Sequence, residues 1–469
     1  MTFTTLTFLL CFLPLLTALY FLCPLRRLAL RNTVLLVFSL VFYAWGEPVY
    51  VLLIMLCAGL TYLLSYAVQR GSRLAFILSL LVNLGPLLLF KYADFILLNI
   101  GQLLGQPPRA LGLTMPIGIS FYTFQVITYI IDLYRKQVAL QKNWAYLLLY
   151  IFFFPQLVAG PIVRYADVEK EIGNRQTTAQ DVSAGVQRII IGLSKKMLVA
   201  NPAGEAVRVI RAQNQALVGP GLLWICVFSY GVQIYFDFSA YSDMAIGLGR
   251  IFGFHFLENF NKPYIARSVT DFWRRWHISL STFFRDYVYI PMGGNRVGVP
   301  RHLFNLLIVW FLTGLWHGAY WNYAFWGLYY FVLLALEKYV SGGLLSRLPG
   351  FWARAVTFFF YMFGWAIFLY ESNSALEVGR FLLRLFGFGA FSAERLSLRA
   401  LEIQGNFIVV LFGLLLSTTR LDRMPKSAGA YLPRTLRQAL SGVCLLVLLA
   451  ASILSVIGSS FNPFIYFRF

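Results

Sequence analysis

The stretch Phe311-Leu-Thr-Gly-Leu-Trp316-His317-Gly318-Ala-Tyr-Trp321 lies inside an apolar run that is long enough to cross a bilayer. An imidazole at membrane depth costs free energy, so it persists mainly where it lines a cavity, has a partner or does chemistry. A second histidine, His277, lies upstream in Asp271-Phe-Trp-Arg-Arg-Trp-His277-Ile-Ser-Leu. These two histidines are the first candidates for the function of the chain.

The composition is that of a polytopic membrane protein. The 469 residues are 59% hydrophobic and 12% charged, whereas a soluble domain averages about 25% charged residues. Because apolar runs extend from end to end, we expect one integral-membrane domain over residues 1–469. The net charge of +20 comes from basic residues between apolar runs, which favours positive-inside anchoring over nucleic-acid binding. The five cysteines are typical of small buried hydrophobic residues.

The sequence predicts an all-α polytopic fold of roughly 10–13 spanning helices, each of about 20 apolar residues. Residues 1–22 lack the marks of a removable signal peptide and are expected to be a retained first span. The run 145–163, broken by Pro155 and Pro161, is expected to enter the bilayer and return. The more basic run 183–203 is expected to lie along the interface. The candidate spans are 3–22, 32–46, 49–68, 74–98, 113–133, 145–163, 218–240, 302–319, 322–341, 352–371, 402–419 and 437–458.

Lys and Arg residues in the short loops set the expected orientation. The loop after the first run holds Arg26, Arg27 and Arg31, whereas the loop 46–48 has no basic residue. The loop 420–436 is again basic. Both termini are therefore expected on the side of the membrane away from the cytoplasm.

The segment from about 240 to 300 is too polar for simple spans and too aromatic for a solvated loop. Irregular backbone is tolerated at membrane depth where it is buried in protein or lines a wet cavity. We therefore expect re-entrant and interfacial helices that build a central funnel or tunnel, with the active-site region over approximately 235–320. Asp237 and Tyr241 are candidates for substrate binding there, or for tying helices together.

His317 is a candidate general base. A reaction at a hydroxyl needs a group that takes the hydroxyl proton, and histidine, with an unperturbed pKa of about 6.5, suits this role. A low-dielectric pocket favours its neutral form. Gly314 and Gly318 are expected to leave room for a substrate near the ring, and Trp316 is a candidate for substrate binding. The alternative is a structural histidine that is hydrogen-bonded between helices.

His277 is the second catalytic candidate, and the alternative is an interfacial residue beside Arg274 and Arg275. Charges at this depth are expected to pair with one another. Arg274 or Arg275 is alternatively a contact for the phosphate of an acyl donor. The sequence has no glycine-rich phosphate loop, no Ser-His-Asp series and no H-x-x-x-H spacing, so no metal is expected.

Several motifs together resemble the membrane-bound O-acyltransferase (MBOAT) family, in particular its bacterial branch that O-acetylates exported polysaccharides such as alginate and cellulose. Besides the two histidine motifs, they are Phe121-Tyr-Thr-Phe-Gln125, Tyr129-Ile-Ile-Asp-Leu-Tyr-Arg135 and Phe154-Pro-Gln-Leu-Val-Ala-Gly-Pro-Ile-Val-Arg164. The resemblance covers essentially the whole chain. It places His317 at the family's catalytic histidine and His277 at its second polar active-site residue.

The resemblance implies an O-acyltransferase of the bacterial inner membrane. It passes acetyl groups from a cytoplasmic donor, acetyl-CoA or another acetyl donor, toward alginate, cellulose or a similar exopolysaccharide, with no bound cofactor. It also implies an extracytoplasmic partner of the SGNH-esterase type. The tail 459–469 resembles an aromatic tail of this branch. Tyr466 is therefore expected to carry the acyl group as a phenolic ester or to dock the partner, and the alternative is an aromatic belt anchor.

A transporter or flippase with an intramembrane His/Asp proton relay is the alternative from another class. Such folds often show interrupted helices in matching halves of the chain. Here the polar, Pro/Gly-broken material is concentrated between about 235 and 320. This asymmetry favours the enzyme.

Overall fold

Helices account for all the regular structure in the described part of the chain, as the sequence predicts. A computed structural model of the chain describes residues 1–24, 26–105, 110–213, 218–340, 347–389, 400–418, 433–458 and 464–465. These ranges contain no strand. The α-helices are α1 (Leu13–Leu22), α2 (Leu28–Ala44), α3 (Tyr50–Gln69), α4 (Arg73–Leu87), α5 (Ala93–Leu103), α6 (Ile119–Tyr134), α7 (Trp144–Phe152), α8 (Phe154–Leu157), α9 (Tyr165–Gly173), α10 (Ala179–Ser194), α11 (Asn201–Arg211), α12 (Pro220–Ile251), α13 (Val269–Trp273), α14 (Ile278–Phe284), α15 (Val299–His317), α16 (Trp321–Tyr339), α18 (Gly350–Leu369), α19 (Ala375–Leu385), α20 (Ala400–Thr418) and α22 (Arg434–Gly458).

Short π-helical segments join several of these helices. Leu88–Tyr92 connects α4 to α5, and Lys195–Ala200 connects α10 to α11. Further π-helical turns lie at Thr7–Phe12 and Arg285–Tyr289. Because such turns add one residue to a helical turn, they re-aim the side chains that follow without ending the helix.

The chain divides into two compact units. The first consists of Met1–Ile189, Tyr241–Glu258 and Pro463–Phe469, and the second of Ile190–Ala240 and Asn259–Asn462. The helix α12 contributes residues to both. The expectation of one domain over residues 1–469 stays a prediction.

Six helical segments among the described residues are long and apolar enough to cross a membrane, which confirms a polytopic membrane protein. They are Tyr50–Gln69, Arg73–Leu103, Pro220–Ile251, Val299–His317, Gly350–Leu369 and Gln438–Gly458. Shorter apolar helices lie at Thr7–Leu22, Leu28–Ala44 and Asn406–Thr418.

Three of the other candidate runs are not among these six segments, for identifiable reasons. The run 113–133 forms only the 16 residues of α6, about 24 Å against a hydrocarbon core of about 30 Å. The run 145–163 breaks at Phe153 into α7 and α8, neither long enough to cross. The helix α16 has 19 residues, but its Trp, Tyr, Asn, Glu and Lys residues lower its hydropathy.

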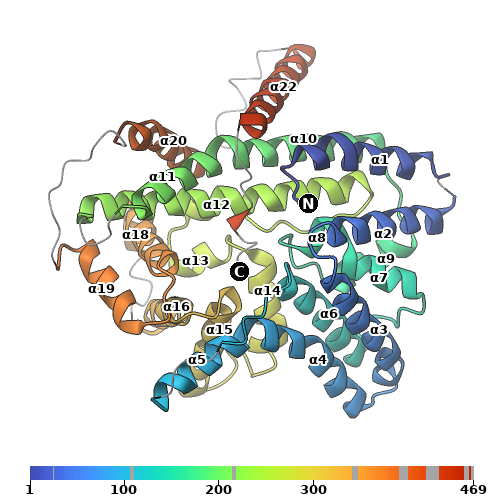
Figure 1. Cartoon of the computed structure of the whole chain (residues 1–469), viewed down its shortest axis with the longest axis horizontal. Coiled ribbons are helices and arrows are strands. Elements are labelled where there is room, and N and C mark those ends of the chain that lie inside the picture. The colour runs from blue at the N-terminus through green and yellow to red at the C-terminus, as the bar shows by residue number, and fades with distance from the viewer. Residues whose placement is uncertain are drawn as a thin grey trace. The chain divides into compact units, whose positions relative to one another are not determined.

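The first unit packs α3, α4, α6 and α7 together, in the blue to teal part of Figure 1. Nearly every residue of α6 is buried, including the polar Thr123, Gln125 and Thr128. The Tyr150 hydroxyl of α7 donates to backbone oxygens of Gln125 and Val163 at 3.0 and 2.9 Å. The polar face of α6 is therefore directed into protein rather than lipid.

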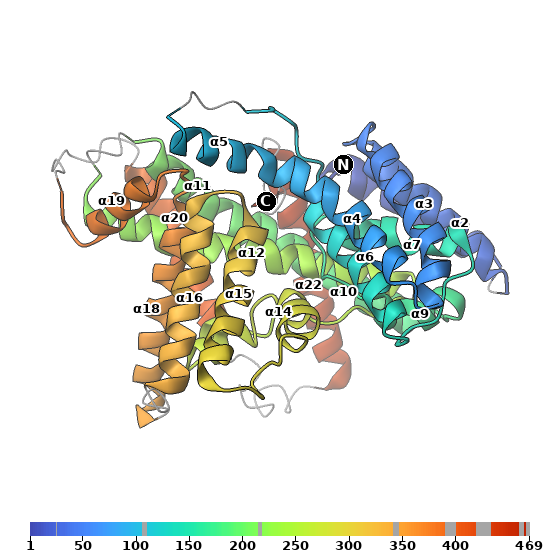
Figure 2. The same ribbon diagram turned by 90° about the horizontal axis from the view of Figure 1, so that it is seen from below.

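The second unit is organised around α15, α16 and α18, which stand next to one another in Figure 2. The first two form a hairpin with very close backbones. A Cβ atom at Gly314 would overlap the backbone oxygen of Tyr323, and one at Gly327 would overlap that of Trp310. Glycine is therefore required where these helices meet.

The irregular region is shorter than expected at its start. The helix α12 continues to Ile251, so Asp237 and Tyr241 lie on a regular helix and not in a broken segment. Gly253 ends this helix with a φ of +80°, a conformation that favours glycine at a helix terminus. From there to residue 298 the chain forms only short helices, as predicted, and aromatic stacking supports them: Tyr264 and Phe272 each lie 4.8 Å from the ring of Tyr361 on α18.

Candidate active site

His277 lies at a strained backbone position in the second unit. Its φ and ψ are 45° and 55°, in the left-handed region, and it immediately precedes α14. Non-glycine residues adopt this conformation rarely, and often at functional sites. The imidazole is 1% exposed, and burial lowers the pKa of His277 well below its usual value. Its ring is therefore neutral at physiological pH.

One oxygen holds His277 in place. The Nδ1 atom lies 3.1 Å from Oδ1 of Asn259. The same Oδ1 accepts from the backbone N–H and the hydroxyl of Ser279, at 3.2 and 2.9 Å. Local sequence reasoning missed Asn259 because its partners lie well downstream in the chain.

His317 ends α15 and is surrounded by aromatic rings. It is 2% exposed, and its ring lies 5.1 Å, edge to face, from both Trp326 and Phe368. The indole of Trp316 lies 4.9 Å from the His317 ring and 5.7 Å from the His277 ring. The structure thus brings both predicted catalytic histidines together around Trp316.

The glycines beside His317 have a different role from the expected one. A Cβ atom at Gly318 would overlap the ring of Tyr323, and one at Gly314 would overlap the Tyr323 backbone oxygen. The space that a side chain would fill at either glycine is therefore occupied by α16. Helix packing, rather than room for a substrate, accounts for both.

A cavity of about 460 Å³ reaches His277 from the surface of the second unit. His277 and Arg274 line it with residues of α14 and α15. Another lining residue, Arg285, is 60% exposed at its side chain, so the cavity connects the buried imidazole with the outside of the unit. Its residues include Trp273, Ser281, Thr313 and Leu334. This volume is sufficient for part of a small-molecule ligand.

The other candidates in the second unit are in ion pairs. Arg275 Nε lies 2.7 Å from Oδ1 of Asp271. Asp237, 1% exposed at its side chain, pairs with the ammonium group of Lys196, 3% exposed. These pairs agree with the expectation that charges at this depth partner one another.

The remaining two candidates are elsewhere. Tyr241 belongs to the first unit, where its ring lies 4.7 Å from Phe3 and 4.9 Å from Phe464. Tyr466 lies outside the described residues. Among the residues that the structure does describe, no group of three or more His, Cys, Asp or Glu side chains is arranged to hold a metal ion.

His302, at the other end of α15, is in a polar cluster behind the cavity wall. Its Nε2 lies 2.7 Å from the hydroxyl of Tyr289, which lines the cavity, and 3.2 Å from Nζ of Lys338. Its Nδ1 lies 2.7 Å from the hydroxyl of Tyr339. The cluster joins the π-helical turn, α15 and α16.

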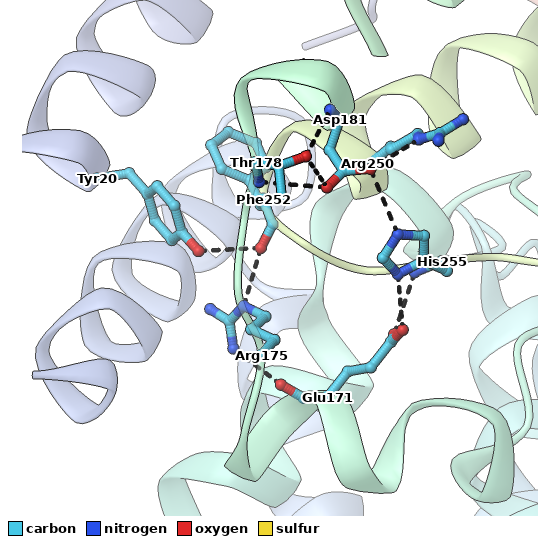
Figure 3. A network of polar contacts seen from close by, with 8 residues as sticks. All are labelled: Tyr20, Glu171, Arg175, Thr178, Asp181, Arg250, Phe252 and His255. Atoms are coloured by element: carbon cyan, nitrogen blue, oxygen red, sulfur yellow. Dashed lines mark hydrogen bonds and ion pairs between the residues drawn. The ribbon is translucent and has the colours of Figure 1, made fainter. Parts of the chain in front are cut away.

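His255 belongs to a separate network in the first unit (Figure 3). Its Nδ1 lies 2.8 Å from Glu171, and Arg250 lies 3.2 Å from Asp181. Hydrogen bonds from Thr178 lower the pKa of Asp181 to about 2. These contacts tie α9, α10 and the end of α12 together, so we assign them a structural role.

Comparison with known proteins gives consistent matches. The family described as membrane-bound O-acyltransferase matches residues 75–376. The chain is 35% identical to a probable alginate O-acetylase AlgI of Pseudomonas aeruginosa and 37% identical to that of Pseudomonas putida, each over 100% of both chains. It is 33% identical to a peptidoglycan O-acetyltransferase of Helicobacter pylori, over 74% of this chain and 73% of that protein.

Proposed function

The chain belongs to the membrane-bound O-acyltransferase family, and we propose that this O-acyltransferase passes acetyl groups from a cytoplasmic donor across the membrane for O-acetylation of an exported polysaccharide. The observation that carries the proposal is full-length similarity to alginate O-acetylases, together with two buried histidines whose rings both lie near that of Trp316. The chemistry is acyl transfer to a hydroxyl. Because one relative is a peptidoglycan O-acetyltransferase and others are alginate O-acetylases, the identity of the polysaccharide is a question for experiment.

In this proposal His317 is the general base. It takes the proton of the accepting hydroxyl as the oxygen attacks the acyl carbon, and later returns a proton to the leaving group. Its aromatic surroundings exclude water, which strengthens the electrostatic interactions made during the transfer. His277 and Trp316 orient the acceptor beside it.

The donor enters through the cavity. Arg274 is an exposed residue at its wall, and a guanidinium there suits a phosphate group of a donor such as acetyl-CoA. The acyl end of the donor then points toward the buried imidazole of His277.

On the outer face we propose that an extracytoplasmic SGNH-type partner completes transfer to the sugar. Tyr466 either carries the acyl group to that partner or docks it. A phenol is a reasonable carrier because its reference pKa of about 10 makes it a better leaving group than an ordinary alcohol. The bacterial inner membrane, with both termini outside the cytoplasm, is the proposed location.

The test is transfer of radioactive acetyl from acetyl-CoA to protein or glycan in proteoliposomes that contain the purified chain. We expect time-dependent labelling with the wild-type protein and none with His317→Ala. Flux of a solute without acyl transfer would instead support the transporter alternative and overturn the proposal.

A further inference from the structure

The helix α14 begins without a capping side chain of its own. Its N-cap residue is His277, whose side chain makes no capping hydrogen bond, although Ser, Thr, Asp or Asn usually occupies this position. The first N–H groups of a helix need acceptors from outside it. Ile278 N–H donates to the backbone oxygen of Asn259 at 3.0 Å, and Ser279 N–H donates to its Oδ1 at 3.2 Å. Asn259 therefore caps α14 from a separate segment.

The same contacts determine which nitrogen of His277 carries the proton. A backbone N–H can only donate, so the Asn259 atom that faces Ser279 must be the oxygen. That oxygen can only accept, and it lies 3.1 Å from Nδ1 of His277. An unprotonated Nδ1 would set two lone pairs against each other. The neutral ring must therefore have its hydrogen on Nδ1 and a lone pair on Nε2.

Ser279 does not offer a competing arrangement. Its hydroxyl lies 3.5 Å from Nδ1 of His277 but 2.9 Å from Oδ1 of Asn259. Hydrogen bonds weaken toward the longer distance, so the hydroxyl donates to Asn259 and leaves the imidazole contact to the amide oxygen. Asn259 is itself 0% exposed, and water does not replace it.

We propose that Asn259 is a positioning residue of the acyl transfer, which fixes the Nδ1–H tautomer of His277 so that Nε2 presents a lone pair to a hydroxyl of the acceptor next to the one that His317 deprotonates. The inference rests on the proposed function because it needs His277 to act in the reaction. It goes beyond a cap, because a cap alone would not select a tautomer.

The charged groups near His277 come from several elements. Arg274 and Arg285 share its cavity, and the ring of His317 lies 4.9 Å from Trp316, whose ring lies 5.7 Å from that of His277. Asp237, next to Phe238, whose ring lies 4.6 Å from the imidazole, is paired with Lys196. These groups are the same in every variant below, so a change in His277 reports on position 259.

The direct test is ¹⁵N NMR of the full chain in proteoliposomes with labelled histidine. The chain has four histidines, and His277→Gln assigns the signal of His277 by difference. We expect the Nδ1–H tautomer in the wild type and its loss in Asn259→Ala. A wild-type His277 in the Nε2–H tautomer, or an Nδ1–H tautomer unchanged by Asn259→Ala, overturns the proposal without reference to activity.

The second test compares pH profiles of [¹⁴C]acetyl transfer from acetyl-CoA to protein or glycan in the same proteoliposomes. Asn259→Asp keeps an acceptor for both the cap and Nδ1 but adds a negative charge, which favours the imidazolium. The acid limb of the profile should move up by about 1–3 pH units. Asn259→Ala should lower the rate about 10- to 100-fold, by analogy with the loss of the hydrogen-bond partner of a metal-ligating histidine in other enzymes.

The matched control is Asn305→Ala. Asn305 is also 0% exposed, but its amide donates to backbone oxygens of Met292 and Gly294. It should reduce the amount of protein without moving the pH profile. An Asn259→Asp profile that coincides with that of the wild type reduces Asn259 to a cap. Full activity in His277→Ala refutes the proposed role of His277 in the reaction. In that case Asn259 still fixes the tautomer that NMR reports, but it is not a positioning residue of the acyl transfer.

Discussion

His317 is the residue on which the proposed chemistry depends most. His317→Ala removes the base while Trp326 and Phe368 keep their places around it. We expect normal insertion and a fall in acetyl transfer of about 100- to 10,000-fold. Labelling of glycan in proteoliposomes, with the amount of protein measured in parallel, checks this.

The control for that variant is His255→Ala, because the side chain of His255 is 52% exposed and belongs to the other unit. It should keep the acyl transfer of the wild type per amount of protein, even where the loss of its contact with Glu171 lowers the abundance. Near-normal transfer by His317→Ala at normal abundance would remove His317 from the mechanism.

His277 should tolerate an amide better than His317 does. An orienting contact survives in part when an amide replaces the ring, whereas a proton acceptor does not. The left-handed backbone adds an order: His277→Asn should retain more activity than His277→Gln, since asparagine is enriched in that conformation. His277→Ala should be the least active of the three. Transfer rates at equal protein amounts test the series, and equal, complete loss at both histidines would indicate two proton-transfer roles.

The sequence alone singles out both histidines as candidates, because a titratable ring in an apolar run is conspicuous by itself. It was not sufficient to identify Asn259, whose role depends on a turn that brings residue 259 back to residues 277–279. The purpose of Gly314 was also hidden, since only the approach of α16 shows what fills its side-chain position.

The α15–α16 hairpin is the element that places His317. Gly314→Ala would force these helices apart, because the added methyl overlaps a backbone oxygen that cannot move independently. Overpacking of this kind costs about 1–3 kcal/mol. We expect a lower thermal unfolding temperature in detergent and a weaker acyl transfer.

Gly379→Ala is the matched change, on α19 with open space around its Cβ position. Alanine there should leave the unfolding temperature unchanged or raise it slightly, because glycine is a poor helix former. If both variants unfold at the same temperature as the wild type, the close approach of α15 and α16 is not a constraint.

The buried pair between Lys196 and Asp237 joins the π-helical segment 195–200 to α12. Lys196→Met leaves a carboxylate without its partner and should cost about 3–5 kcal/mol. The double variant Lys196→Met/Asp237→Leu should recover most of this loss. Thermal unfolding measures the recovery. Acyl transfer by a stable double variant would show that Asp237 does not bind substrate, and its complete loss would favour the substrate-binding role.

Among the elements, the long uniform runs were the most predictable, and α3 and α18 lie close to the expected ranges 49–68 and 352–371. The end of α12 could not be predicted in this way, because Asp237 and Asp243 interrupt the apolar pattern but not the helix. Their partners, Lys196 and Arg188, allow a helix to carry buried carboxylates. Such compensation depends on residues that are distant in sequence.

For the molecule as a whole, Tyr241 connects segments from opposite ends of the chain within the first unit. Phe464 is 1% exposed, and its ring lies edge to face with that of Tyr241. The ring of Phe3 stacks on the Tyr241 ring. Phe464→Ala should destabilise the protein by about 3–5 kcal/mol, as other buried Phe→Ala changes do.

Tyr466→Phe keeps the aromatic ring of residue 466 and removes only its hydroxyl. It should preserve the unfolding temperature while reducing glycan acetylation.

These two tail variants separate anchoring from chemistry. Thermal unfolding and acetyl labelling are measured on the same preparations. Wild-type acetylation in Tyr466→Phe leaves only a docking or anchoring role for Tyr466. An unchanged unfolding temperature in Phe464→Ala would contradict the packing of Phe464 on Tyr241.

The meeting of Phe3, Tyr241 and Phe464 also has a consequence for biosynthesis. The ribosome delivers Phe3 well before Tyr241, and Tyr241 well before Phe464. Domains generally fold as units during synthesis, but this unit lacks one of its buried rings until residue 464 has been synthesised. A nascent chain that stalls before residue 464 therefore lacks the Phe464 ring that packs on Tyr241 in the complete unit.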